Sequence, residues 1–455
     1  MRDIVLTAFV AVLLPFCLAR PWIGILAWTW VGLMVPQMQT WGFARGVPFA
    51  MLIAGATLAG VLFTKDRKPI PWTRETVLLA LLWGMFLLST IFAIMPERAW
   101  DQLMKVSKIL LFVFLTLMFF QDRTRLRYLY LVTALSLAFY GVKGGIFALG
   151  TGGVHRVYGA PTGFFASNNS VGLALNTIIP MLFFLAKDEE RRWLRNGLRV
   201  AFWLCAVAVV FTYSRGAFLG LIIVMAVLFL KARYALIAVV AAALLYVVVT
   251  PYLPERWTNR MATIETIDDK STHNRLAAME VAWKVAVDRP LLGAGFWGLA
   301  NKLTYAQYGY VLSISAHNMY LDILADHGFV AFSMFLTMLL SCLWSLFWLR
   351  QRNRGSPDRA WVVRYSLMLE ACLVAYMANA VFQSAAYTDL LYLLVALVIL
   401  LKTVAAVPVP VTAPARAVPV TAVPVRGAAS RVPAPVVRRP ALGGPPPAGP
   451  TRTRL

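Results

Sequence analysis

The sequence predicts an all-α integral membrane protein of about twelve transmembrane helices, with one large structured loop and a basic tail. Of its 455 residues, 60% are hydrophobic and 14% are charged, whereas soluble domains are about 45–50% apolar and about 25% charged. Apolar runs of near-spanning length recur along the chain, and Lys and Arg gather in alternate loops. We therefore interpret the net charge of +23 through membrane topology and expect no nucleic-acid partner.

Eleven apolar runs each come close to the length of a membrane span, some requiring tilt or a thinner bilayer. They cover residues 48–63, 76–95, 102–120, 126–149, 170–186, 198–213, 215–230, 233–250, 319–349, 364–385 and 388–404. Residues 4–36 contain two shorter runs of about 15 residues, split by Arg20 and Pro21, where roughly 20 are needed to cross. We count residues 4–36 as one span, which makes twelve; thirteen spans with an external N-terminus is the alternative.

Basic residues assign the sides of the membrane. Nineteen Lys and Arg lie in the loops 64–75, 121–127, 187–199, 231–233 and 350–364. The positive-inside rule makes these loops cytoplasmic, which places the long polar loop at 250–317 outside. We therefore expect N-terminal transmembrane helices over 1–249, this loop over 250–317, and C-terminal transmembrane helices over 318–405.

The C-terminal segment, residues 406–455, is rich in Pro, Ala, Val and Arg and has no acidic residue. This composition is typical of disorder, because it cannot bury enough apolar surface to fold. On the cytoplasmic side, such a tail can contact anionic membrane lipids. We see no internal repeat, which disfavours a transporter built from inverted halves.

The long outer loop is expected to contain a helix near residues 272–289. Ser271 or Thr272 can cap it, and Pro290 ends it. One face of this helix collects apolar side chains at helical spacing, namely Leu276, Met279, Trp283, Ala286 and Val287. The following segment, Arg289 to Gly295, is rich in turn residues whose glycines allow close approach of the backbone.

A histidine stands where the outer loop meets the next apolar run, in the stretch from Ser315 to Gly328. We place His317 in the first turn of a helix, after a possible Ser315 cap. The helix dipole disfavours protonation there, so the imidazole remains available as a base. A purely structural histidine is the alternative.

Five cations lie on the outer side, where the topology rule disfavours them. Arg215 sits between two adjoining spans, and Arg275 opens the loop helix, while Arg156, Lys105 and Lys143 lie near other outer helix ends. Together they could surround a diphosphate, since arginine offers two parallel donors and lysine a point charge. The simpler alternatives are that such side chains reach lipid headgroups, or that Arg275 pairs with Glu280 or caps its helix.

We expect neither a metal ion nor a cofactor. Asp268 and Asp269 are adjacent rather than spaced to converge, and Asp322 and Asp326 share a helix face without a nearby histidine pair outside their own motif. The four cysteines all lie in apolar segments, which does not suggest a thiolate site. No phosphate-binding loop, dinucleotide fingerprint or serine-hydrolase elbow is present in the sequence.

The chemistry-bearing residues occur in an ordered set of motifs. In chain order these are Gly159-Ala-Pro-Thr-Gly-Phe-Phe-Ala-Ser-Asn-Asn169, Ser-Arg-Gly at 214–216, the Arg-led loop helix at Arg275, Arg289-Pro-Leu-Leu-Gly-Ala-Gly295, and His-Asn-x-x-Leu-x-x-x-x-x-x-Gly from His317 to Gly328. The set resembles the O-antigen ligase (WaaL-type) family, within the wider group of O-antigen ligases, polymerases and O-oligosaccharyltransferases. Two departures are Asn318, where the family often has Ser, and Asp326, where Glu is common.

The resemblance implies a metal-independent, inverting glycosyltransferase of the GT-C-like class in the bacterial inner membrane, with its site facing the periplasm and its tail in the cytoplasm. The donor would be a glycan on undecaprenyl diphosphate, and the acceptor a sugar of lipid A-core. The resemblance assigns catalysis to His317, Arg215 and Arg275. Substrate-binding candidates are Arg156, Lys105, Lys143, Asn168, Asn169, Asn318 and Tyr320.

The acceptor stays open at this point. A polymerase of the same group would join two lipid-linked glycans, and a protein O-oligosaccharyltransferase would use a Ser or Thr hydroxyl. A transporter of lipid-linked glycans is an alternative of another class, because it could use the same cations for binding but would not need a base.

Overall fold

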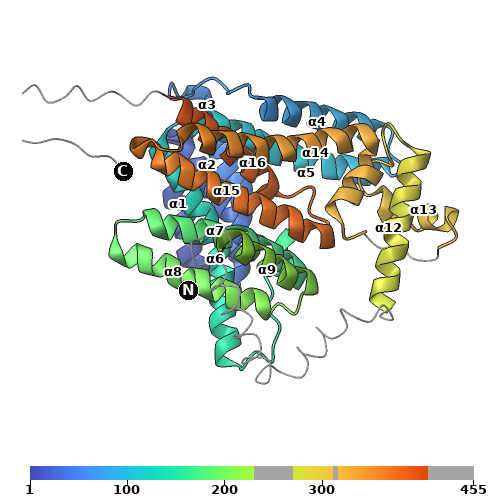
Figure 1. The fold of residues 1–455 in the computed structure, drawn as a ribbon, viewed down its shortest axis with the longest axis horizontal. Coiled ribbons are helices and arrows are strands. Elements are labelled where there is room, and N and C mark those ends of the chain that lie inside the picture. Colours follow the sequence, from blue (N-terminus) through green and yellow to red (C-terminus); the bar gives the residue numbers. More distant parts are fainter. Residues whose placement is uncertain (230–269, 311–315, 408–455) are drawn as a thin grey trace, which may run out of the picture. The chain divides into compact units, whose positions relative to one another are not determined.

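The regular elements of the computed structural model are helices throughout the part of the chain that it describes, residues 1–229, 270–310 and 316–407 (Figure 1). The elements are α1 Arg2–Ala19, α2 Pro21–Met34, η1 Pro36–Gln39, η2 Phe43–Gly46, α3 Phe49–Phe63, α4 Arg74–Ile91, α5 Pro96–Phe119, α6 Arg123–Gly150, η3 Phe164–Ala166, α7 Asn168–Asp188, α8 Arg192–Val210, α9 Arg215–Phe229, α12 Lys270–Asp288, η5 Gly298–Ala300, α13 Lys302–Gln307, α14 Met319–Asn353, η6 Pro357–Arg359, α15 Ala360–Asn379, η7 Ala380–Phe382 and α16 Asp389–Ala406.

Within these ranges, nine helices are long and apolar enough to cross a membrane, and α2, α3 and α9 are shorter apolar helices. The predicted all-α polytopic fold is therefore confirmed. The predicted span 233–250, the residues Asp268, Asp269 and Ser315, and nearly all of the predicted tail lie outside the described residues.

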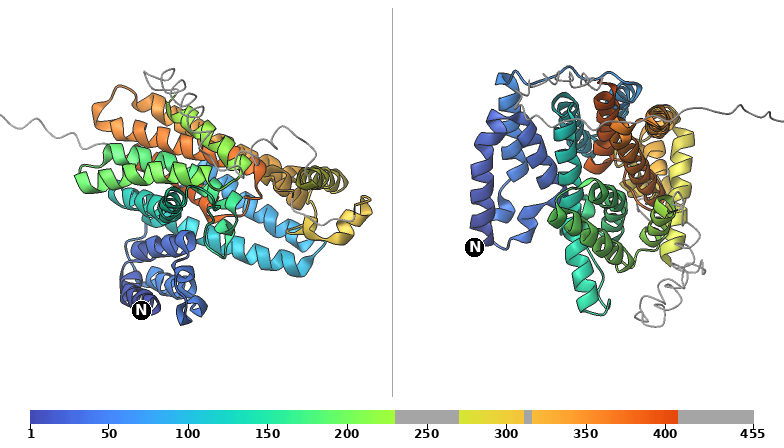
Figure 2. Two further views of the ribbon diagram at one scale, coloured as in Figure 1. Left: turned by 90° about the horizontal axis from the view of Figure 1, so that it is seen from below. Right: turned by 60° about the vertical axis from the view of Figure 1, so that its left-hand side comes forward.

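The first two helices form an antiparallel hairpin, so residues 4–36 are not one continuous span; α1 is long enough to cross a membrane, and α2 is a shorter apolar helix. The rings of Phe9 in α1 and Trp30 in α2 lie 5.6 Å apart, although each residue is about ten positions from the turn at Arg20. Pro21 explains the break, because proline disfavours helical geometry in the residue before it, and Arg20 has an extended φ of −136°. Helices α1, α2 and α3 pack side by side around a core of their own (Figure 2, dark blue).

The most buried helices are α7 and α16. Helix α16 has only leucine, valine and similar residues through most of its length, which suits a helix surrounded by protein on all sides. Close approach of α6 to α8 depends on Gly145, where an added Cβ would lie 2.4 Å from the Leu204 carbonyl oxygen. The other long helices pack around this centre.

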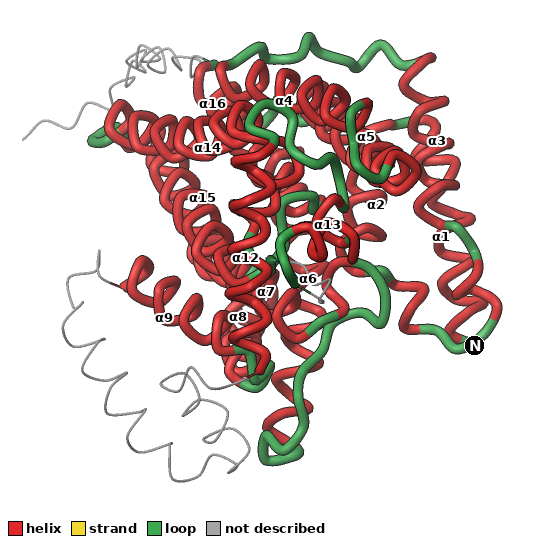
Figure 3. Tube along the Cα trace, turned by 90° about the vertical axis from the view of Figure 1, so that its right-hand side faces the viewer, coloured by secondary structure: helices red, strands yellow, loops and turns green. Residues whose placement is uncertain are grey.

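Helix α12 matches the helix predicted near residues 272–289, but only part of the predicted apolar face is buried: Ala286 is buried as predicted, whereas the larger side chains are not. Leu276, Trp283 and Val287 are about half exposed, whereas the second hydrophobic cluster takes Ala278, Val281, Ala282 and Val285 from this helix. Small side chains occupy the buried face because they let α12 lie close to α14. Seen from the α12 side in Figure 3, this helix crosses in front of the bundle. The side chains of the suggested caps, Ser271 and Thr272, are outside the described part.

Two sequence motifs join where α14 is kinked. Gly328 has a φ of 77°, which breaks the helical path, and the freed Phe329 N–H donates to the Pro290 carbonyl at 2.7 Å. Gly295 N–H likewise donates to the Asp326 carbonyl at 2.8 Å. A Cβ at Gly293 would lie 2.5 Å from the Asp326 carbonyl carbon, so only glycine fits there. The close backbone approach predicted for the Arg289–Gly295 segment is confirmed.

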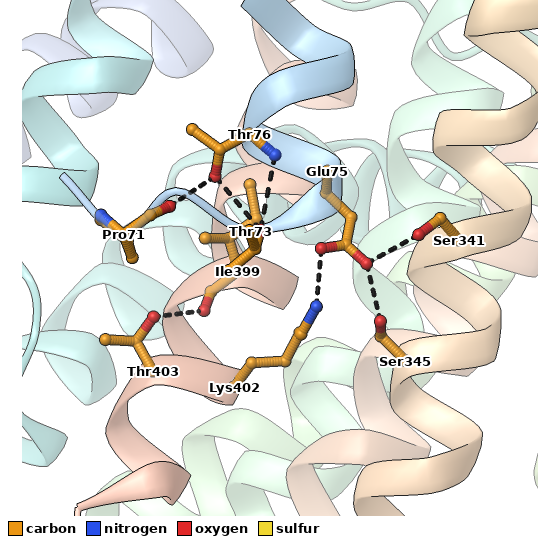
Figure 4. Close-up of polar contacts among 9 residues, drawn as sticks. All are labelled: Pro71, Thr73, Glu75, Thr76, Ser341, Ser345, Ile399, Lys402 and Thr403. Atoms are coloured by element: carbon orange, nitrogen blue, oxygen red, sulfur yellow. Dashed lines mark hydrogen bonds and ion pairs between the residues drawn. The ribbon is translucent and has the colours of Figure 1, made fainter.

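A buried ion pair ties α4, α14 and α16 together at the end of the bundle away from His317. The fully buried Glu75 accepts hydrogen bonds from Ser341 at 2.8 Å and Ser345 at 2.6 Å, and its other oxygen lies 2.6 Å from Lys402 Nζ (Figure 4). We call these four residues the Glu75 cluster. Both carboxylate oxygens have partners, which offsets the cost of burying the charge.

Candidate functional site

His317 stands immediately before α14 rather than in its first turn. The cap is Asn318, whose Oδ1 accepts from the Tyr320 N–H at 3.0 Å and the Leu321 N–H at 3.2 Å, so the expected position of His317 was wrong. His317 has a φ of 49°, a left-handed conformation that costs free energy in a residue with a Cβ. Such strain is found at sites where a side chain must be held in one direction.

The electrostatic environment of His317 favours the neutral imidazole. The side chain is half-buried, and burial lowers its pKa below the usual value, with the positive charge of Arg275 lowering it further. A lower pKa favours the neutral ring, which is the form that can accept a proton. Arg275 lies on α12 and His317 precedes α14, so packing of α12 on α14 brings two of the predicted site residues within electrostatic reach.

Arg215 occupies the first position of α9. Ser214 is the cap, because its Oγ accepts from the Ala217 N–H at 3.2 Å and its carbonyl from the Phe218 N–H at 2.9 Å. The Arg215 guanidinium and the first N–H groups of α9 lie at the same end of this helix. A phosphate group bound there could contact both.

The segments before α7 and before α9 meet beside Arg215. The Asn168 side chain donates to the Thr212 carbonyl at 2.9 Å, and the Arg156 guanidinium lies 5.8 Å from the centre of the Tyr213 ring. Tyr213 has a left-handed φ of 58°, and its hydroxyl donates to the Gly153 carbonyl at 2.7 Å. The predicted binding residues Arg156 and Asn168 thus lie next to the motif that carries Arg215.

The structure places the remaining predicted binding residues in varied settings. Asn169 is half-buried in the first turn of α7, and Lys105 is exposed on α5. Lys143 donates to Gln39 Oε1 at 3.1 Å. The hydroxyl of Tyr320 donates to the Met377 carbonyl at 3.1 Å, where it joins α14 to α15.

Two side chains already engage the carboxylate considered as a partner for Arg275. Glu280 receives Lys284 at 2.7 Å and the Tyr310 hydroxyl at 2.7 Å. These contacts lower the pKa of Glu280, the hydrogen bond from Lys284 being the largest cause. An ion pair between Arg275 and Glu280 would therefore have to compete with Lys284 and Tyr310, which already contact this carboxylate.

Sequence reasoning missed one segment entirely, the loop of residues 380–388 between α15 and α16. The predicted apolar runs 364–385 and 388–404 include all of its residues except Ala386 and Tyr387, although α15 ends at Asn379. The available signal was a short polar interruption between two apolar runs, formed by Gln383, Ser384, Tyr387 and Thr388. We call this segment the 380–388 loop.

The 380–388 loop touches three helices that begin at predicted site motifs. Gln383 Nε2 donates to Ser170 Oγ of α7 at 3.0 Å. A Cβ added at Gly216 of α9 would lie 2.7 Å from Phe382 Cβ. On α14, Tyr387 donates to Asp326 Oδ2 at 2.9 Å, and Ser384 hydrogen-bonds Asp322. Helices that follow three of the predicted motifs thus contact the same loop.

No group of three or more His, Cys, Asp or Glu side chains that could hold a metal occurs within the described ranges. Asp322 and Asp326 are both buried and lie one helical turn apart. Their hydrogen-bond donors from the 380–388 loop are hydroxyl groups. These contacts do not test whether the protein uses a metal, so metal independence stays a prediction.

Two segments of the chain match two different protein families. Residues 200–336 match the family described as O-antigen ligase, and residues 1–190 match a family of unknown function (DUF5935). No curated protein matches the chain. The fold is that of a polytopic membrane protein, and the first match supports the superfamily of O-antigen ligases and polymerases, hence a transferase that uses lipid-linked glycans in general. His317, Arg215 and Arg275 all fall inside residues 200–336.

Proposed function

We propose that the protein is an O-antigen ligase that transfers a glycan from undecaprenyl diphosphate to a sugar hydroxyl of lipid A-core. The reaction takes place on the periplasmic side of the bacterial inner membrane, with the basic tail in the cytoplasm. The observation that carries the proposal is the proximity of Arg275 to a strained, half-buried His317 whose pKa is lowered, within the segment that matches the ligase family.

In this mechanism His317 acts as the general base. Neutral imidazole accepts the proton of the acceptor hydroxyl as its oxygen forms a bond to the anomeric carbon. The bond from that carbon to the diphosphate oxygen breaks on the opposite face, which inverts the configuration. The diphosphate leaves with increased negative charge.

The arginines stabilise the leaving group. Arg215 meets the diphosphate at the N-terminus of α9, where the helix dipole adds to its charge. Arg275 supports the same charge and also holds the His317 pKa down. Two guanidinium groups can supply the stabilisation that a divalent metal supplies in other transferases, which is why we propose a metal-independent reaction.

A polymerase is the second candidate, because the matching family supports both reactions. The purified protein should be mixed with a synthetic polyprenyl-diphosphate glycan and, in separate reactions, lipid A-core, a second lipid-linked glycan, or a Ser/Thr peptide. We expect a mass increase of lipid A-core. Transfer to only the second glycan or only the peptide would replace the ligase assignment, and absence of transfer to any acceptor in detergent would favour a transporter.

A further inference from the structure

The 380–388 loop contacts α7, α9 and α14 close to their N-terminal ends. Below it, the Asn176 side chain of α7 donates to the Ala217 carbonyl of α9 at 2.8 Å and to Asn379 Oδ1 of α15 at 2.9 Å. The contacts with the 380–388 loop and the hydrogen bonds of Asn176 restrict the movement of α7, α9 and α15 relative to one another. Any movement of the loop would therefore change the position of α9 relative to α14.

The bond between Tyr387 and Asp326 is the best-defined attachment of this loop to α14. Around it lie Ser384 and Asp322 one turn away, and His327, whose Nδ1 is 2.5 Å from Ser89 Oγ. The rings of Phe86 and Phe296 enclose this group, with centroids 5.8 and 4.8 Å from that of Tyr387. Aromatic packing on all of these sides fixes the direction of the Tyr387 hydroxyl.

Burial of two carboxylates so close together is costly, and a stable membrane helix does not require it. One oxygen of Asp326 accepts a hydrogen bond from Tyr387, and Asp322 hydrogen-bonds Ser384 of the same loop. What both carboxylates specify is the position of the 380–388 loop against α14. The same loop packs Phe382 onto Gly216, directly after Arg215.

We propose that the 380–388 loop is the positioning element that sets Arg215 relative to His317, and that Tyr387 and Asp326 are its positioning residues. The inference rests on the proposed transferase function of the site. Phe382 carries the position of the loop to the start of α9, and the Tyr387–Asp326 bond carries it to the start of α14. Neither Tyr387 nor Asp326 touches substrate in this scheme.

The chain offers a matched control for removing the Tyr387 hydroxyl. Tyr365, near the other end of α15, donates to Asp188 Oδ2 at 2.7 Å, so Tyr365→Phe also deletes one tyrosine–carboxylate bond. We expect Tyr387→Phe to lower kcat by about tenfold or more with little change in KM, since small misplacements of reacting groups are costly. Tyr365→Phe should leave kcat within about twofold. Equal effects of the two variants would overturn the proposal.

Rescue by a neutral isostere separates positioning from chemistry at Asp326. Asp326→Asn keeps an oxygen that can accept from Tyr387, whereas Asp326→Leu does not. We expect the Asn variant to retain most of the wild-type kcat and the Leu variant to match Tyr387→Phe. If the Asn variant is as inactive as the Leu variant, the carboxylate itself acts in the reaction and the positioning role is refuted.

A distance measurement tests the loop without relying on activity. Spin labels at Leu219→Cys in α9 and Leu276→Cys in α12 use exposed positions, while the four native cysteines are buried. Tyr387→Phe should shift or broaden the distance distribution, and Tyr365→Phe should not. An unchanged distribution in an active enzyme would refute the loop proposal, whereas a shift in a protein that transfers to no acceptor would refute only the proposed function.

Discussion

Helix α14 carries buried carboxylate contacts at both of its ends, and the two differ in how charge is balanced. In the Glu75 cluster, an ammonium group and two hydroxyls satisfy one carboxylate (Figure 4). At the other end, Asp322 and Asp326 bind hydroxyls of the 380–388 loop, in the part of α14 that follows the left-handed His317. The first arrangement stabilises the bundle, and the second holds strained, chemistry-bearing segments in place. We therefore expect substitutions at the two ends to separate activity from stability.

The largest effect on activity is expected from His317→Ala. Loss of the base should lower transfer by at least about 10²-fold while the protein still inserts and keeps its Tm, because general-base catalysis contributes that much or more. Product formation and thermal unfolding of the purified protein measure the two effects. His155→Ala, an exposed histidine on the segment before α7, is the control and should retain activity. Normal turnover of folded His317→Ala would remove His317 from catalysis.

Arg215→Lys tests the shape of the charge at the start of α9. Lysine keeps the charge but loses the two parallel donors, so we expect kcat to fall by about 10²-fold. Steady-state kinetics with the lipid-linked donor measure this change. Arg192→Lys at the exposed start of α8 makes the same exchange elsewhere and should be silent. Near-normal kcat for Arg215→Lys would mean that a point charge suffices.

Lys402→Met should destabilise the protein without impairing the folded enzyme. It leaves Glu75 buried without its cation, which we expect to cost about 3 kcal/mol of unfolding free energy. The double variant Glu75→Gln with Lys402→Met should recover much of this loss, since the buried charge is gone. Thermal unfolding, with activity expressed per folded molecule, tests both. If Lys402→Met lowers the activity per folded molecule as much as His317→Ala does, the two ends of α14 do not separate stability from activity.

The smallest expected effect is a shift in the pH profile of Arg275→Gln. The Arg275 charge helps to hold the His317 pKa down, so its removal raises that pKa. Because His317 must be neutral to accept a proton, the acid limb of the normalised kcat/KM profile should move to higher pH. Lys284→Gln, on the same helix, should leave the limb in place. If the acid limb does not move in Arg275→Gln, that limb does not report the protonation of His317.

Hydropathy predicted most helices because apolar length alone decides whether a segment can cross a membrane. It failed for residues 4–36, where a proline turned one expected span into a hairpin. It also failed for α12, whose larger apolar residues were assigned to the buried face. Side-chain size contributed to that face, since Ala278 and Ala282 are fully buried in the cluster that joins α12 to α14, whereas Leu276 stays exposed.

The sequence by itself determined the membrane class, the order of the motifs and the identity of His317, Arg215 and Arg275 as candidates, because these depend on composition and residue chemistry. Tertiary structure alone decided which of them lie together and what supports them. The proximity of Arg275 to His317 arises from packing of α12 on α14. The 380–388 loop joins residues more than 200 positions apart, from Ser170 to Gln383. Such contacts depend on how helices pack, which no local pattern encodes.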